Sequence, residues 1–158
     1  MKLREWLDQW SMSSLKINLG ILDAEWKPND HDKDAAWELY IELITRVATQ
    51  QLEPDAGDEN AALDSIYKLF DLTRATIKGK GRHCIEFTRI AVVVLNQKIR
   101  PFTAKWHRLA KQGAFTNEVQ RALFRTELDE LQTLLRNYTR MLAAMAAVED
   151  LTDVENKI

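Results

Sequence analysis

The sequence contains little cysteine, proline and glycine, and each scarcity excludes or disfavours a class of protein. Its 158 residues include one cysteine, three prolines and five glycines. The single cysteine, Cys84, cannot close an internal disulfide or build a cysteine-rich zinc site. So little glycine and proline argues against a loop-rich sandwich, and 46% hydrophobic residues argue against disorder. The composition favours one domain, because a chain of roughly 150 residues buries most of its unfolded surface.

Long apolar segments are also lacking. The apolar run from Ile90 to Leu95 has six residues and the longest, from Met141 to Val148, has eight, whereas a membrane-spanning helix needs about twenty. The first ten residues carry four charged side chains, so the apolar centre of a signal peptide does not form there. We therefore expect a soluble, cytoplasmic protein with no membrane partner.

Only one segment has the period of a β-strand. After an amphipathic helix predicted for Lys2 to Gln9, four apolar residues alternate with polar ones, and the apolar phase shifts near Gly20. These residues are Leu15, Ile17, Leu19 and Ile21. We expect a small N-terminal β element, either a hairpin or a strand that pairs with another chain.

The remaining chain has the apolar spacing of helices. The first predicted helix begins at Asp30 or Asp32 and runs to about Gln51. Its expected apolar stripe is Trp37, Tyr40, Ile41, Ile44, Val47 and Ala48. A second helix, from Glu59 to Lys78, is expected to bury Leu63, Ile66, Tyr67, Phe70 and Ile77. A third covers Arg82 to Ile99, and Pro101 kinks or restarts it before it continues to Lys111.

The strongest helical pattern is the last one, predicted from Asn117 to Glu149. Apolar residues recur there at alternating steps of four and three, which is the heptad spacing of a packed helix. They are Phe124, Leu128, Leu131, Leu135, Tyr138, Leu142 and Met145.

These patterns predict an all-α protein, a bundle of four to five helices with a long C-terminal helix. We expect one domain over residues 1–158. Residues 1–27 would hold the N-terminal helix and the β element, residues 30–149 the bundle, and residues 150–158 a flexible tail.

The net charge of −2 conceals two opposite blocks. From Asp23 to Asp64 acidic residues exceed basic ones by nine, and from Arg74 to Lys111 basic residues exceed acidic ones by nine. The blocks could pair within one chain or between chains, or the basic block could bind the phosphates of a nucleotide or nucleic acid. The phosphate-binding candidates are Lys80, Arg82, Lys98, Arg100, Lys105 and Arg108.

Arg100 and His107 are the candidate catalytic pair. Six residues separate them, so on a helix they lie two turns apart near one face. A histidine moves protons near neutral pH, and an arginine stabilises charge that develops on phosphate. An arginine and a histidine so spaced on a late helix of an α-bundle resemble the motif of the HEPN family. That resemblance implies a metal-independent ribonuclease that acts as a dimer.

No cofactor or metal site is predicted. Arg82-His83-Cys84 places its histidine and cysteine on different faces, so they are poor joint ligands. His31 lies among three aspartates at a helix start, where helix capping explains the acids.

The hypothesis that combines these patterns is a non-catalytic helical protein that acts by association. It would be a homo-oligomer or a small accessory subunit of a larger bacterial assembly, because the chain also resembles small bacterial proteins, some of which lie beside larger enzymes in phage-defence loci. The predicted interface is Leu15, Ile17, Leu19, Ile21, Trp26, Phe124, Leu128, Leu131 and Leu135. The alternatives are the ribonuclease and a nucleotide- or nucleic-acid-binding protein.

Overall fold

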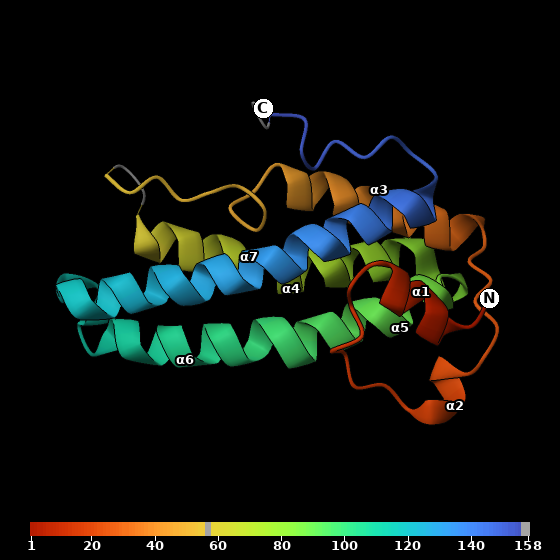
Figure 1. Cartoon of the computed structure of the whole chain (residues 1–158), viewed down its shortest axis with the longest axis horizontal. Helices are drawn as coiled ribbons and strands as arrows, with labels where there is room; N and C mark the ends of the chain where they lie inside the picture. Colours follow the sequence, from red (N-terminus) through yellow and green to blue (C-terminus); the bar gives the residue numbers. More distant parts are fainter. Residues whose placement is uncertain (56–57, 156–158) are drawn as a thin grey trace.

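The structure, a computed structural model, describes residues 1–55 and 58–155 (Figure 1). Its α-helices are α1 (Leu3–Gln9), α2 (Leu19–Leu22), α3 (Asp30–Ile44), α4 (Glu59–Lys80), α5 (Ile85–Val94), α6 (Arg100–Lys111) and α7 (Glu118–Ala146). Short 3-10 turns, η1 (Gly81–His83) and η3 (Ala114–Thr116), join α4 to α5 and α6 to α7. Within these residues no strand forms, so the predicted all-α class is confirmed.

The predicted N-terminal β element was wrong. Asn18 caps a single helical turn, because its side chain accepts a hydrogen bond of 2.8 Å from the backbone N–H of Gly20. The alternating residues therefore do not share a strand face: Leu15 is buried, whereas Leu19 is 67% exposed. The one β-bridge in the described chain joins Lys2 to Glu25 and ties this segment to the chain's own first residues.

The N-terminal segment packs against the end of the bundle that holds the start of α5 (Figure 1). Leu3 and Leu7 on α1 are buried in the same core as Trp26. The Trp6 ring stacks on Trp26 with centroids 5.7 Å apart, and it meets Trp10 edge-on at 5.8 Å. The apolar surface of this segment is thus largely covered within the chain.

Helix α3 ends at Ile44, seven residues before the predicted end. Side chains of α7 bind the backbone that follows it. Gln132 donates to the carbonyl oxygens of Val47 and Gln50, and Arg136 Nε donates to that of Thr49 at 3.1 Å. A helical continuation would use these carbonyl groups internally, so the contacts with α7 favour an irregular connection.

Helix α4 is tied to α7 through Glu59, whose side chain is almost fully buried. Its Oε1 atom lies 2.9 Å from Arg121 Nε and 3.3 Å from Arg125 Nε. Burial acts to raise the pKa of Glu59, but the hydrogen bond from Arg121, a backbone hydrogen bond and the charges of the two arginines outweigh it. The net effect lowers the pKa of Glu59 from its usual value, which favours the charged carboxylate.

Helices α5 and α6 form one continuous rod that contains a wide turn. The segment η2 (Leu95–Ile99) is a π-helix, and the N–H of Arg100 donates to the carbonyl of Leu95. Pro101 follows at once, and a proline there has no N–H and collides with the carbonyl of an ordinary α-turn. The wide turn accommodates the proline, so the predicted break is a π-turn within an unbroken helix.

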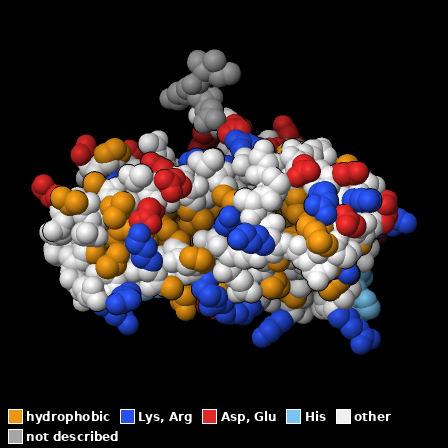
Figure 2. All heavy atoms as spheres, turned by 60° about the horizontal axis from the view of Figure 1, so that its bottom comes forward, with side chains coloured by type: hydrophobic (Ala, Val, Ile, Leu, Met, Phe, Trp, Pro, Cys, Tyr) orange, Lys and Arg blue, Asp and Glu red, His pale blue; other side chains and the backbone are white. Residues whose placement is uncertain are grey.

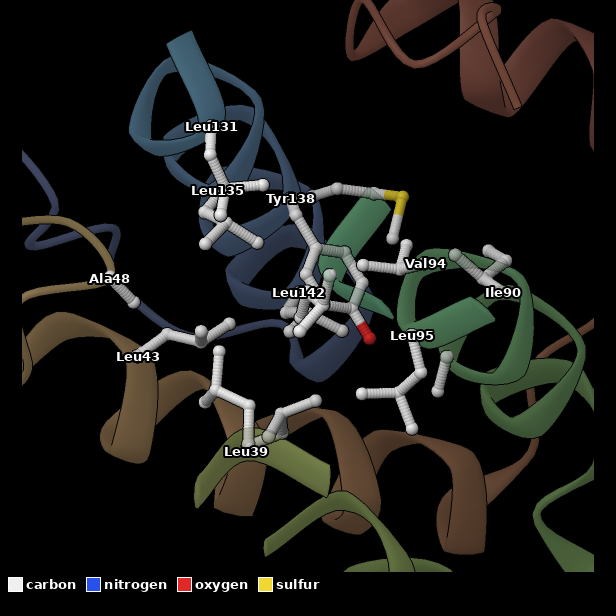
Figure 3. Close-up of a cluster of buried hydrophobic side chains, with 14 of the residues drawn as sticks. Leu39, Leu43, Ala48, Ile90, Val94, Leu95, Leu131, Leu135, Tyr138 and Leu142 are labelled. Carbon is white, nitrogen blue, oxygen red and sulfur yellow. The ribbon is translucent and has the colours of Figure 1, made fainter. Parts of the chain in front are cut away.

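Helix α7 begins at Glu118 with Asn117 as its cap, close to the predicted start. All seven of its heptad residues are buried, and α7 packs most extensively on α3. Figure 3 shows Leu131, Leu135, Tyr138 and Leu142 of α7 facing the core side chains of α3 and α5. The Tyr138 hydroxyl has no hydrogen-bond partner there, and burial raises the pKa of Tyr138.

Three aromatic or apolar residues predicted to be buried are exposed. On α3, Trp37 is 49% and Ile41 is 37% exposed, because the helix turns Ala36, Leu39 and Leu43 to the core instead. On α4, Tyr67 is 53% exposed. Because α3 and α4 carry more apolar residues than their buried faces hold, the sequence pattern predicted wider buried faces than the structure has.

Candidate anion-binding surface

Only two ion pairs within the described chain join the acidic block to the basic block. Lys80 Nζ lies 2.7 Å from Glu38 Oε1, and this hydrogen bond raises the pKa of Lys80. His107 Nε2 lies 3.8 Å from Asp64 Oδ1. The other paired cations of the basic block bind acids outside the acidic block. Internal pairing therefore engages little of the basic block.

Six cations of the basic block form no ion pair with any residue in 1–55 or 58–155: Lys78, Arg82, Lys98, Arg100, Arg108 and Lys111. Four of them are among the six predicted phosphate-binding residues. The other two predicted residues, Lys80 and Lys105, hold Glu38 and Glu127 at 2.7 Å. In the view of Figure 2, Lys and Arg side chains line the lower edge of the molecule, whereas Asp and Glu side chains lie toward the upper edge, with further Lys and Arg among them at the right.

Two arginines from different helices converge on one aromatic ring. The guanidinium of Arg100 on α6 lies 4.7 Å from the centroid of the Phe70 ring on α4, and that of Arg74 lies 5.6 Å from the same centroid. Arg74 pairs with Asp71, whereas the Arg100 guanidinium donates its hydrogen bonds to the neutral side-chain oxygen of Asn96 and forms no ion pair in the described chain. Two guanidinium groups beside one ring give this part of the surface a positive potential that attracts anions.

Two further rings lie beside these arginines, one on α4 and one on α6. The centroid of the Tyr67 ring lies 5.6 Å from that of Phe70. The Tyr67 ring also meets the His107 ring nearly at a right angle, with centroids 4.9 Å apart. We call Arg74, Phe70, Arg100, Tyr67 and His107 the arginine–aromatic row. It combines two exposed arginines with one exposed ring, that of Tyr67, and surfaces that bind nucleic acid combine positive charge with exposed rings in this way.

An open hollow adjoins the row at its Tyr67 end. Its lining residues are Asn60, Leu63, Asp64, Tyr67, His107, Ala110 and Lys111. One wall is therefore aromatic, and the polar groups on its rim include one carboxylate and one ammonium. The hollow is shallow, so a ligand there would remain partly in solvent.

The candidate catalytic pair faces α4 but does not meet at one point. Arg100 lies on Phe70, whereas His107 lies against Tyr67 and near Asp64. Their seven-residue offset corresponds to roughly 10 Å along the helix axis. Within one chain the two side chains would therefore contact different parts of a ligand.

Most of the predicted interface residues are covered within the chain. Phe124, Leu128, Leu131 and Leu135 are buried against the protein's own core, and Leu15 and Trp26 are buried as well. Ile17 and Ile21 are half-buried against that core, and Leu19 alone of the set is exposed. The heptad spacing therefore reflects the packing of α7 against its own bundle.

The remaining candidate groups form no metal cluster in the described residues. No three His, Cys, Asp or Glu side chains lie together as ligands in that part of the chain. The rings of His31 and His83 lie 5.5 Å apart at the surface, while Cys84 is buried and contacts Thr88. No helix within the described ranges is long and apolar enough to cross a membrane.

Sequence reasoning missed Tyr67 and Arg74 as site residues. Arg74 belongs to the basic block but was not selected, and Tyr67 was assigned to the core. Both lie on α4, seven residues apart, and therefore on nearly the same side of the helix as each other. That spacing, set against Arg100 and His107 on a later helix, was the available signal.

Comparisons of the chain with family models, with curated proteins and with solved structures found no match.

Proposed function

We propose that this chain is a non-catalytic binding protein whose partner is a nucleic acid, held through its phosphates at the arginine–aromatic row. The observation that carries the proposal is the convergence of Arg74 and Arg100 on Phe70 without a carboxylate to neutralise Arg100. Guanidinium groups bind phosphate oxygens through charge-assisted, often bidentate hydrogen bonds. A phosphate bound by both groups would offset the charge of Arg100, which no carboxylate neutralises in the described chain.

The surrounding charge supports a polyanion over a single small anion. Lys111 lines the adjoining hollow, and Arg108 on α6 and Lys78 on α4 are exposed with no ion pair in the described ranges. A single phosphate would engage only the two arginines. A strand with several phosphates can also reach these flanking cations and release more counterions.

Removal of both arginines is expected to weaken binding strongly. The double variant Arg74→Ala/Arg100→Ala should bind a labelled RNA about 100-fold more weakly in fluorescence anisotropy, since each lost phosphate contact costs about 1.4 kcal/mol, or tenfold. The matched control is Lys27→Ala/Lys33→Ala, which removes two exposed cations from the acidic block. We expect the control to stay within about threefold of wild type. Equal losses in the two variants would contradict the proposal.

A ribonuclease is the second candidate, supported by the placement of Arg100 and His107 on the face of α6 that contacts α4. The RNA from the binding experiment can be run on a denaturing gel. Cleavage that disappears in His107→Ala would favour this candidate over a non-catalytic protein.

Association with a protein is supported by a different surface. Trp37 and Ile41, four residues apart on α3, are exposed and lie side by side on the helix. Such a pair could contact a second copy or a larger subunit, as the accessory-subunit hypothesis requires. This surface is separate from the row, so both kinds of binding could occur in one molecule.

A further inference from the structure

We infer that the hollow beside the row holds one unpaired base, so that the chain binds single-stranded nucleic acid in preference to a duplex. The inference rests on the proposed function and adds the strand type that the site takes. It comes from the exposure of Tyr67, the two rings that fix it, and the distribution of charge around the hollow.

Tyr67 has the exposure and the support of a stacking platform. About half of its side chain is open to solvent. Its two ring contacts are an edge contact with His107, at an interplanar angle of 84°, and a tilted one with Phe70 at 54°. Neither neighbour stacks face to face on the tyrosine, so these contacts hold the ring in place without a parallel stack. A nucleic-acid base can form that parallel stack with Tyr67.

The charges divide the site into a phosphate end and a base end. The two guanidinium groups gather at Phe70, whereas the carboxylate of Asp64 stands in the hollow, 3.8 Å from His107. In the hollow the Asp64 carboxylate offsets the charge of Lys111, whereas no carboxylate offsets that of Arg100, so phosphates favour the Phe70 end. The uncharged edge of a base would instead meet Asn60 and Asp64, which carry the donors and acceptors that bases recognise.

A duplex cannot use this hollow. Its bases are stacked and paired inside the helix, and only its phosphates and groove edges reach a shallow surface. An unpaired base is free to turn outward onto an aromatic ring. The row should therefore give both strand types a phosphate contact and give the single strand an additional stacking contact.

The test compares two substitutions of Tyr67. Fluorescence anisotropy is measured with a labelled oligouridine of about twenty nucleotides and with an RNA duplex of the same length, a span that covers at least one binding site. Tyr67→Ala should weaken binding to the oligouridine about tenfold, as loss of one stacked base does, and leave duplex binding within about twofold. Tyr67→Phe keeps the ring and should retain the wild-type affinity for both. Because Tyr67 is exposed, neither variant should lose its helical circular dichroism.

The arginine double variant separates the two proposals. If Tyr67→Ala binds oligouridine like wild type while Arg74→Ala/Arg100→Ala binds weakly, the base inference is overturned and the phosphate proposal stands. Equal losses of Tyr67→Ala on single strand and duplex also overturn the inference. If the wild type binds neither RNA, or the arginine variant binds both undiminished, the proposed function itself fails.

Discussion

Replacement of Trp106 by alanine should lower the free energy of unfolding by about 4 kcal/mol, the cost typical of a fully buried tryptophan. Trp106 on α6 has no exposed surface. Its ring meets Phe124 edge-on at 5.2 Å and stacks on Phe115 at 6.0 Å, so it joins α6 to η3 and α7. Its removal leaves a large cavity where these elements meet. Urea unfolding followed by circular dichroism measures the loss.

The control for this substitution is Trp37→Ala. The two residues have the same side chain, but half of Trp37 is exposed on α3. We expect a loss of about 0.5 kcal/mol there, as for most surface substitutions. Similar losses in the two variants would contradict the packing of α6 described here.

Replacement of Asp32 by asparagine should cost about 2 kcal/mol, the penalty for leaving buried donors without an acceptor. The carboxylate is fully buried, and it accepts a hydrogen bond from the N–H of Asn29 at 2.8 Å and one from the N–H of Phe87 at 3.0 Å. It thus links the start of α3 to the start of α5. An amide has only one oxygen, so its NH₂ group must face one of these two donors.

Asp30→Asn provides the comparison. Asp30 is also in the first turn of α3, but it is exposed, so its charge interacts only with the helix dipole. That interaction contributes a few tenths of a kcal/mol, to about 1 kcal/mol at most. Urea midpoints of the two variants measured side by side separate these contributions. If Asp30→Asn is as destabilising as Asp32→Asn, the buried link between α3 and α5 is not the source of the effect.

Elements whose form depends on their own residues could be predicted from the sequence. The spacing from Phe124 to Met145 specifies one helix face whatever packs on it, and α7 follows it closely. Cap positions were harder, because Asn29 and two nearby aspartates are all competent caps. The structure uses Asn29 as the cap, and the Asp32 carboxylate accepts a hydrogen bond from the Asn29 N–H.

Elements that depend on distant contacts could not be predicted. The chain after Ile44 has an apolar helical pattern, yet Gln132 and Arg136 of α7 bind its carbonyl groups and end the helix early. The alternation from Leu15 to Ile21 resembles a strand, yet no partner strand lies beside it in the described chain. A period-two pattern needs such a partner before it becomes a sheet.

The sequence predicted the positive charge of the candidate site but not the residues of α4 that complete it. The basic block and the pair Arg100 and His107 could be found by counting residues, because charge and spacing are properties of the sequence. That Tyr67 and Arg74 face this pair depends on how α4 packs on α6. The same packing leaves Tyr67 exposed, although its position among the apolar residues of α4 indicated burial.

The salt dependence of RNA binding tests most directly whether the arginine–aromatic row binds phosphates. The apparent dissociation constant of the wild-type protein for a labelled oligouridine is measured from about 50 to 300 mM salt. A single strand contributes a slope of about 0.7 for each phosphate neutralised, so contacts with Arg74, Arg100 and one or more flanking cations predict a slope of about 2 to 3 in a log–log plot. Weak binding with a slope near zero, or no binding at the lowest salt concentration, would contradict the account.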